Sequence, residues 1–130
     1  MGYRSAIISR RRSAPAAGVP IAPRPNKYRA LATTVDGLRF ASKAEARRYV
    51  VLTFLVKAGL IRCLELQPAF ELSVGGIVIG RYVADFAYVD LREPVPRRVY
   101  EDVKGVRTPL YKWKRKHVQA QYGIEVKEIP

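Results

Sequence analysis

The segment 100–107, YEDVKGVR, contains two acids and a lysine whose spacing could support metal-dependent chemistry. If this segment is extended, side chains alternate between two faces, so Asp102 and Lys104 share one face and Glu101 lies on the other. A carboxylate can hold a divalent cation, and a neighbouring ammonium group can stabilise negative charge that develops in a transition state. Asp102 and Lys104 are therefore candidate catalytic residues. Glu101 is interpreted as structural, and it would replace Asp102 only if the strand register slipped by one residue.

Asp85 is a candidate partner for Asp102, because it interrupts an otherwise apolar, β-rich run over residues 77–90. If this run pairs antiparallel with the next strand and Asp90 faces Arg97, the same register places Asp85 directly opposite Asp102. Two carboxylates so close repel each other unless a cation lies between them. The pair therefore predicts a metal-binding site.

A third acid, Glu45, lies near the start of a helix expected over residues 42–59. It begins the apolar stripe that continues through Tyr49, Leu52 and Val56, so it is expected to face the sheet. Glu45, Asp85 and Asp102 would then meet Lys104 in one pocket. Each acid also has an interpretation without a metal, namely a structural hydrogen bond or ion pair: Asp85 with Arg81, Asp102 with Lys104, and Glu45 with the helix start at Ser42.

The elements that must position these residues follow from turn and cap signals. The signals are a hairpin turn at Asp36-Gly37, a helix from the N-cap Ser42 to Gly59, a turn at Gly75-Gly76, and a helix from the N-cap Thr108 to Gly123. Extended segments are expected over residues 33–35, 38–40, 61–66, 70–74, 77–90, 97–104 and 124–129. This order predicts an α/β fold with a mixed central sheet flanked by helices, the last two strands being joined by a right-handed helical crossover.

The charge balance points to a polyanionic partner. The 130 residues carry 24 Lys and Arg against 11 Asp and Glu, a net charge of +13. Nucleic acid is the first candidate partner and an anionic membrane surface the second. No apolar run approaches the length of a membrane span, and one cysteine, Cys63, fits a reducing cytoplasm. Residues 1–27 are predicted to be a flexible basic arm and residues 28–130 a single domain.

The second helix is rich in bases and follows the candidate catalytic strand directly. Seven cationic side chains are candidate contacts to nucleic-acid phosphates: Arg47, Arg48, Arg107, Lys112, Lys114, Arg115 and Lys116. Tyr111 and Trp113 could stack on unpaired bases, although Trp113 is expected in the core. His117 is expected to be a half-buried helix residue.

Asp85, followed by Asp102-Val103-Lys104 and preceded by Glu45 in a helix, resembles the PD-(D/E)XK, or restriction-endonuclease-like, nuclease superfamily. That superfamily has the core order αβββαβ. The segments TTVDGLRFASKAEARRY, LELQPAFEL, YVADFAYVD and YEDVKGVRTPLYKWKRK further resemble a group of small phage and prophage proteins of unassigned function within it. In this resemblance Asp85 and Asp102 match the metal-binding acids, Lys104 the motif lysine and Glu45 the helix acid. Ala84 stands where the motif's name has proline.

The resemblance implies a DNA endonuclease that uses Mg²⁺. Mn²⁺ is expected to replace Mg²⁺, because both cations accept carboxylate ligands. Its implied substrates are branched, recombination or replication intermediates in a bacterial host cytoplasm, with DNA as partner, no membrane association, and homodimer formation left open. The alternative is a non-catalytic basic nucleic-acid-binding accessory protein. That alternative explains the net charge but gives no role to three acids converging on a lysine.

Overall fold

The computed structural model describes residues 9–10 and 32–130. Apart from Ser9 and Arg10, the predicted basic arm lies outside the described residues. The elements, in chain order, are β1 (Ser9–Arg10), β2 (Thr33–Val35), β3 (Leu38–Phe40), α2 (Lys43–Lys57), β4 (Ile61–Leu66), β5 (Ala69–Val74), β6 (Ile77–Val83), β7 (Phe86–Asp90), β8 (Arg97–Val103), α3 (Pro109–Tyr122) and β9 (Val126–Ile129).

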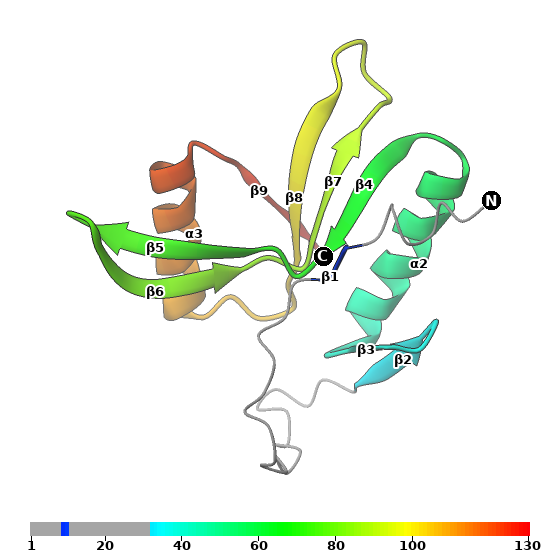
Figure 1. The fold of residues 1–130 in the computed structure, drawn as a ribbon. Helices are drawn as coiled ribbons and strands as arrows, with labels where there is room; N and C mark the ends of the chain where they lie inside the picture. The colour runs from blue at the N-terminus through cyan, green and yellow to red at the C-terminus, as the bar shows by residue number, and fades with distance from the viewer. Residues whose placement is uncertain (1–8, 11–31) are drawn as a thin grey trace.

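A mixed sheet with the order β1-β4-β7-β8-β9 forms the centre of the fold (Figure 1). The strand β7 pairs antiparallel with both β4 and β8, whereas β1 runs parallel to β4 and β9 runs parallel to β8. The helix α3 connects β8 to β9, as the predicted crossover requires. The prediction of a mixed α/β fold with two helices and a central mixed sheet is confirmed.

Two apolar clusters pack on either side of this sheet. One joins α2 and the β2–β3 hairpin to β4 and β7, with Tyr49, Leu52 and Phe86 among its buried members. The other joins α3 to the β5–β6 ribbon and β9, and contains Leu72 and Val118. Figure 1 shows α2 and α3 on opposite sides of the central strands.

The turn and helix-cap residues identified in the sequence adopt the predicted local structures. Asp36 and Gly37 have positive φ angles of 52° and 74° in the β2–β3 turn, which suits a tight hairpin. The Ser42 side chain accepts a hydrogen bond from the Glu45 backbone N–H at the start of α2. Thr108 caps α3 in the same way, and Gly123 ends it in the left-handed conformation.

The sequence predicts one extended run over residues 77–90, but the structure has two strands there. Ala84 and Asp85 separate β6, which pairs only with β5 in a two-stranded ribbon, from β7 in the central sheet. At the break the Ala84 N–H donates to Pro68 O and the Asp85 N–H donates to Glu101 O, each at 3.0 Å. The chain therefore passes from one sheet to another at the residue that the sequence analysis assigned to chemistry.

Neither helix in the described part of the chain is both long enough and apolar enough to cross a membrane.

Candidate active site

The pairing of β7 with β8 has the register that the sequence predicts, with Asp90 opposite Arg97 and Phe86 opposite Glu101. Asp85 comes next along this ladder. Its backbone N–H donates to Glu101 O, and its Oδ2 accepts from the Val103 backbone N–H at 2.7 Å. Asp85 thus bonds to the backbone on both sides of Asp102, through its own N–H on one side and its carboxylate on the other.

Asp102 is fully buried on β8. The Tyr82 hydroxyl on β6 donates a hydrogen bond to its Oδ2. Its Oδ1 has no hydrogen-bond partner and lies 3.4 Å from Lys104 Nζ. That ammonium group also lies 4.5 Å from the centre of the Tyr111 ring, so an aromatic face holds it beside the carboxylate.

The three acids interact electrostatically across this site. Burial, followed by the negative charges of Glu45 and Asp102, raises the pKa of Asp85 to about 8. The pKa of Glu45 is also raised, chiefly by burial and further by Asp102, against the opposing effects of a backbone hydrogen bond from Ala41 and the charge of Lys104. The structure therefore brings Asp85, Asp102 and Lys104 together and places Glu45 within their electrostatic range.

Gln67 lies beside Asp85 in the candidate site, although it is not among the site residues predicted from the sequence. A small cavity lies between Glu45 and Asp85, and Gln67 and Arg39 also line it. The Gln67 N–H donates to Asp85 O, and Gln67 adopts a φ angle of 53°, which is uncommon for a residue other than glycine. The signal in the sequence was the LELQP segment, which turn chemistry alone seemed sufficient to explain.

The donor set fits a hydrated divalent cation. Among the described residues, no three His, Cys, Asp or Glu side chains are grouped so that they could hold a metal ion together. Mg²⁺, however, commonly takes one or two carboxylates and completes its octahedron with water and substrate phosphate. Asp85 and the unpartnered Oδ1 of Asp102 supply that minimum, and Glu45 would act from farther out.

Tyr82→Phe is expected to lower the free energy of unfolding of the metal-free protein by about 1.5–3 kcal/mol, because a buried carboxylate oxygen loses its donor. Denaturant unfolding in EDTA measures this. Tyr122→Phe is the matched control, since the half-exposed Tyr122 hydroxyl donates to the Glu71 backbone carbonyl. Equal losses in the two variants would contradict a special role for the Tyr82 hydroxyl.

Glu101 lies on the opposite face of β8, as strand alternation predicts, and its side chain is fully buried. It accepts hydrogen bonds from Arg48 Nε at 2.8 Å, Arg48 Nη2 at 2.5 Å and the Tyr88 hydroxyl at 2.5 Å. Both ends of the Arg48 guanidinium are thus engaged in the protein interior. Arg48, predicted to contact nucleic acid, is instead the structural partner of Glu101.

The other predicted phosphate contacts differ in exposure. Four of the side chains are exposed: Arg47, Arg107, Lys112 and Lys116. Lys114 is half-buried. Arg107 and Arg115 both form ion pairs with Glu128, at 2.8 and 3.2 Å. The exposed cations therefore lie on α2, on α3 and in the loop before α3, while Arg107 and Arg115 also contact β9 through Glu128.

Two further residues of α3 were assigned an environment from the sequence. His117 is half-buried, as predicted, and its Nε2 donates to the Ser73 carbonyl at 3.1 Å. Trp113 was expected in the core, but 47% of its surface is exposed. Its ring contacts the His117 ring, with the centroids 5.4 Å apart.

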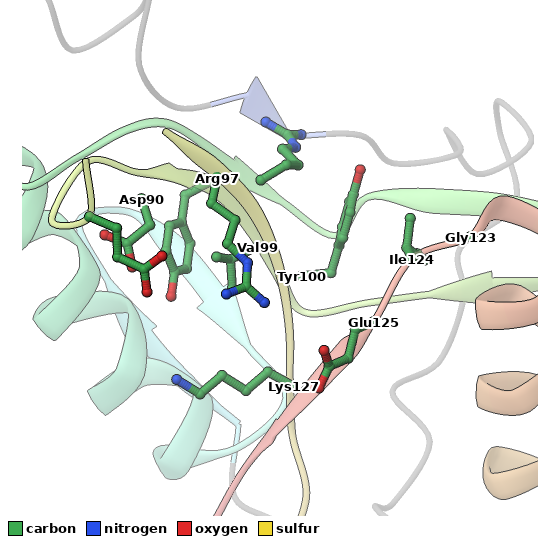
Figure 2. A pocket seen from close by; sticks show the side chains of 11 residues that line it. Asp90, Arg97, Val99, Tyr100, Gly123, Ile124, Glu125 and Lys127 are labelled. Atoms are coloured by element: carbon green, nitrogen blue, oxygen red, sulfur yellow. The ribbon is translucent and has the colours of Figure 1, made fainter. Parts of the chain in front are cut away.

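A larger cavity than the one beside Asp85 lies elsewhere in the described part of the chain, at the Arg97 end of β8 (Figure 2). It has a volume of about 660 Å³. Its lining mixes charges of both signs, including Arg97, Glu125 and Lys127, and none of the four candidate catalytic residues reaches it. Size alone does not identify the site here, because the convergent carboxylates are at the other end of the same strand.

The fold and this cluster define a mixed α/β protein with a carboxylate–lysine site at the point where the chain changes sheets. The chain belongs to the family described as "Protein of unknown function (DUF1064)", whose profile matches residues 25–129. A search of the curated proteins and a search of the solved structures found no match to this chain.

Proposed function

We propose that this protein is a metal-dependent DNA endonuclease of the PD-(D/E)XK type. The observation that carries the proposal is the convergence of Asp85, at the break between β6 and β7, with Asp102 on β8, where Lys104 Nζ lies 3.4 Å from an Asp102 Oδ1 that accepts no hydrogen bond. A fully buried carboxylate, a half-buried carboxylate and an ammonium group at a single point are costly to maintain for structure alone. They are suited to binding a cation and a phosphodiester together.

The order of elements supports the same class. If the β5–β6 ribbon is regarded as an insertion, the chain from α2 onward runs through one helix, the strands β4, β7 and β8, the helix α3 and the strand β9. That is the αβββαβ order of the superfamily which the sequence resembles. Asp102 lies on its third strand, Lys104 directly follows that strand, Asp85 directly precedes the second strand, and Glu45 lies in the first helix.

Each residue then has a chemical role. Asp85 and Asp102 would hold Mg²⁺ or Mn²⁺, which when bound lowers the pKa of water and neutralises charge on the phosphate. Lys104, held between Asp102 and the Tyr111 ring, would donate to the attacking water or to a phosphate oxygen. Glu45, whose pKa is raised by burial, can accept or release a proton at the edge of the site.

The charge of the chain supports DNA as the substrate. Exposed Arg47 on α2 and exposed Lys112 and Lys116 on α3 can contact phosphates, and the net charge of +13 favours association with any polyanion. A branched, recombination or replication intermediate of a phage or prophage, action in the bacterial cytoplasm, and homodimer formation remain predictions from the resemblance.

Cleavage assays with the full chain test this proposal. Supercoiled plasmid, single strands, flaps and four-way junctions are incubated with Mg²⁺, with Mn²⁺ or with EDTA, alongside Lys104→Ala. We expect cleavage of at least one substrate by the wild type with metal, and a loss of about 10²–10³-fold in Lys104→Ala, as for removal of one transition-state donor.

Equal behaviour of wild type and Lys104→Ala on every substrate, with DNA binding retained by both, would overturn the nuclease proposal. The exposed cations and the net charge of +13 would then favour the second candidate, a non-catalytic nucleic-acid-binding accessory protein. The same gels and binding measurements therefore distinguish the two functions.

A further inference from the structure

An exposed apolar strip runs from the β8–α3 loop along α3. It consists of Val106, Leu110 and Trp113, which are 48%, 60% and 47% exposed. Leu110 and Trp113 are three positions apart on α3 and so lie near one another at its start, and Val106 precedes them in the adjoining loop. An exposed tryptophan in such a strip is uncommon on a surface that serves only to face water.

The Trp113 ring is held in place. On one side it packs against His117, whose Nε2 donates to the Ser73 carbonyl of β5. His117, which contacts the Trp113 ring, is therefore itself hydrogen-bonded to β5. A ring fixed on one side and exposed on the other can receive a second flat group without first losing much rotamer freedom.

The surroundings of Trp113 are cationic and close to the candidate active site. Lys112 and Lys116 are exposed on the same helix. Tyr111, two residues before Trp113, lies over Lys104 Nζ. Residues two positions apart lie on different sides of a helix, so a ligand that reaches from the Lys104 ammonium group to Trp113 has to pass around α3. A ligand that spans both must combine negative charge with flat apolar groups, which is the chemistry of a single nucleic-acid strand.

We propose that Trp113 stacks on an unpaired base of the DNA strand that enters the site, so the substrate class is DNA with unpaired nucleotides beside the cleaved bond. A base inside a duplex has both faces covered by its neighbours, whereas an unpaired base offers a face to the indole. This inference rests on the proposed function, because it assigns a substrate to the same site.

Fluorescence provides a direct test, since Trp113 is the only tryptophan in the chain. The full chain is titrated in EDTA, where binding is measured without cleavage, with a single strand, a blunt duplex and an abasic single strand of equal length. The single strand is expected to quench the emission strongly. The abasic strand, whose charge is similar, and the duplex, whose two backbones carry more charge, offer no accessible base and are expected to quench it weakly.

Variants examined with labelled DNA in EDTA complete the test. Trp113→Leu is expected to weaken single-strand binding about 5- to 150-fold, the range for loss of one stacked base, and to leave duplex binding nearly unchanged. Trp113→Phe should restore part of the difference. Phe54→Leu is the matched control, because Phe54 is 73% exposed on α2, on the other side of the sheet.

Three results would overturn the inference: equal quenching by the abasic strand, equal losses for duplex and single strand in Trp113→Leu, or an equal effect of Phe54→Leu. Selective stacking in EDTA without metal-dependent cleavage in any assay would support the stacking site while rejecting the nuclease function. The two proposals therefore fail separately.

Discussion

Asp85→Asn should abolish cleavage and at the same time stabilise the metal-free protein at neutral and alkaline pH. The loss of activity, about 10²–10³-fold or more, follows from removal of a metal-binding carboxylate. The gain in stability follows from the raised pKa of Asp85, about 8, which burial, Glu45 and Asp102 produce together. Asparagine keeps the shape of the side chain and carries no charge next to these groups.

The sign of the pH dependence can be derived from linkage. Between its unfolded pKa near 4 and its folded pKa of about 8, Asp85 holds a proton in the folded state that the unfolded chain has released. The wild type is therefore stabilised by this group at low pH and loses that contribution as pH rises through this window. Asp85→Asn does not titrate, so its advantage over the wild type should grow with pH.

Thermal unfolding in EDTA across this pH range measures the difference. A change of one in pKa corresponds to about 1.4 kcal/mol, which moves the Tm of a domain of this size by roughly 4–8 °C. Mg²⁺ should raise the Tm of the wild type and have little effect on Asp85→Asn. A variant less stable than the wild type at every pH would contradict the electrostatic account of the site.

Asp90→Asn is the matched control, because the same substitution should there have the opposite sign. Hydrogen bonds from the Arg92 side chain and backbone lower the pKa of Asp90 to about 2. Asp90 therefore contributes stability above its unfolded pKa, and this contribution is lost as pH falls through the folded value. Asp90→Asn should be less stable than the wild type at neutral pH, and the difference should vanish in acid.

The contrast between Asp85 and Asp90 illustrates what the sequence could predict. Both acids lie in one β-rich run, and strand alternation with the short loop before Arg97 was sufficient to fix the register and thus the facing of Asp85 and Asp102. Local rules also predicted both helix caps and the Asp36-Gly37 turn, because these depend on a few adjacent residues.

The break between β6 and β7 could not be predicted in the same way. Asp85 stands alone among apolar neighbours, without the cluster of turn residues that usually bounds a strand, and no glycine or proline marks the point. The break exists because the backbone of Asp85 bonds to Glu101 on one side and Gln67 on the other, both distant in sequence. The same long-range bonds explain why the contribution of Gln67 to the site was missed.

The prediction that Trp113 lies in the core was wrong, because it rested on a statistical tendency. Large apolar residues in helices are usually buried, yet Val118 is the buried residue of α3, and Tyr111 is partly buried beside it. The β5–β6 ribbon covers another side of the helix through His117 and Gln121. Because the sequence does not reveal where this ribbon folds, it could not assign Trp113 to the remaining exposed side.

Arg48→Met is expected to cost about 3–5 kcal/mol of the free energy of unfolding, whereas Arg47→Met, one residue earlier on the same helix, should change it by less than about 0.5 kcal/mol. Arg48 donates two hydrogen bonds to the fully buried Glu101, so its removal leaves a buried carboxylate with only the Tyr88 hydroxyl. Arg47 is exposed. Denaturant unfolding of the two variants gives the comparison directly.

A double variant separates the charge from the packing. If the cost of Arg48→Met arises from the unpaired carboxylate, adding Glu101→Gln should recover part of the lost stability, and the two substitutions should be strongly non-additive. Additive effects would show that Arg48 acts through its apolar stem. DNA affinity would then distinguish Arg48 from Arg47, whose loss should weaken phosphate binding.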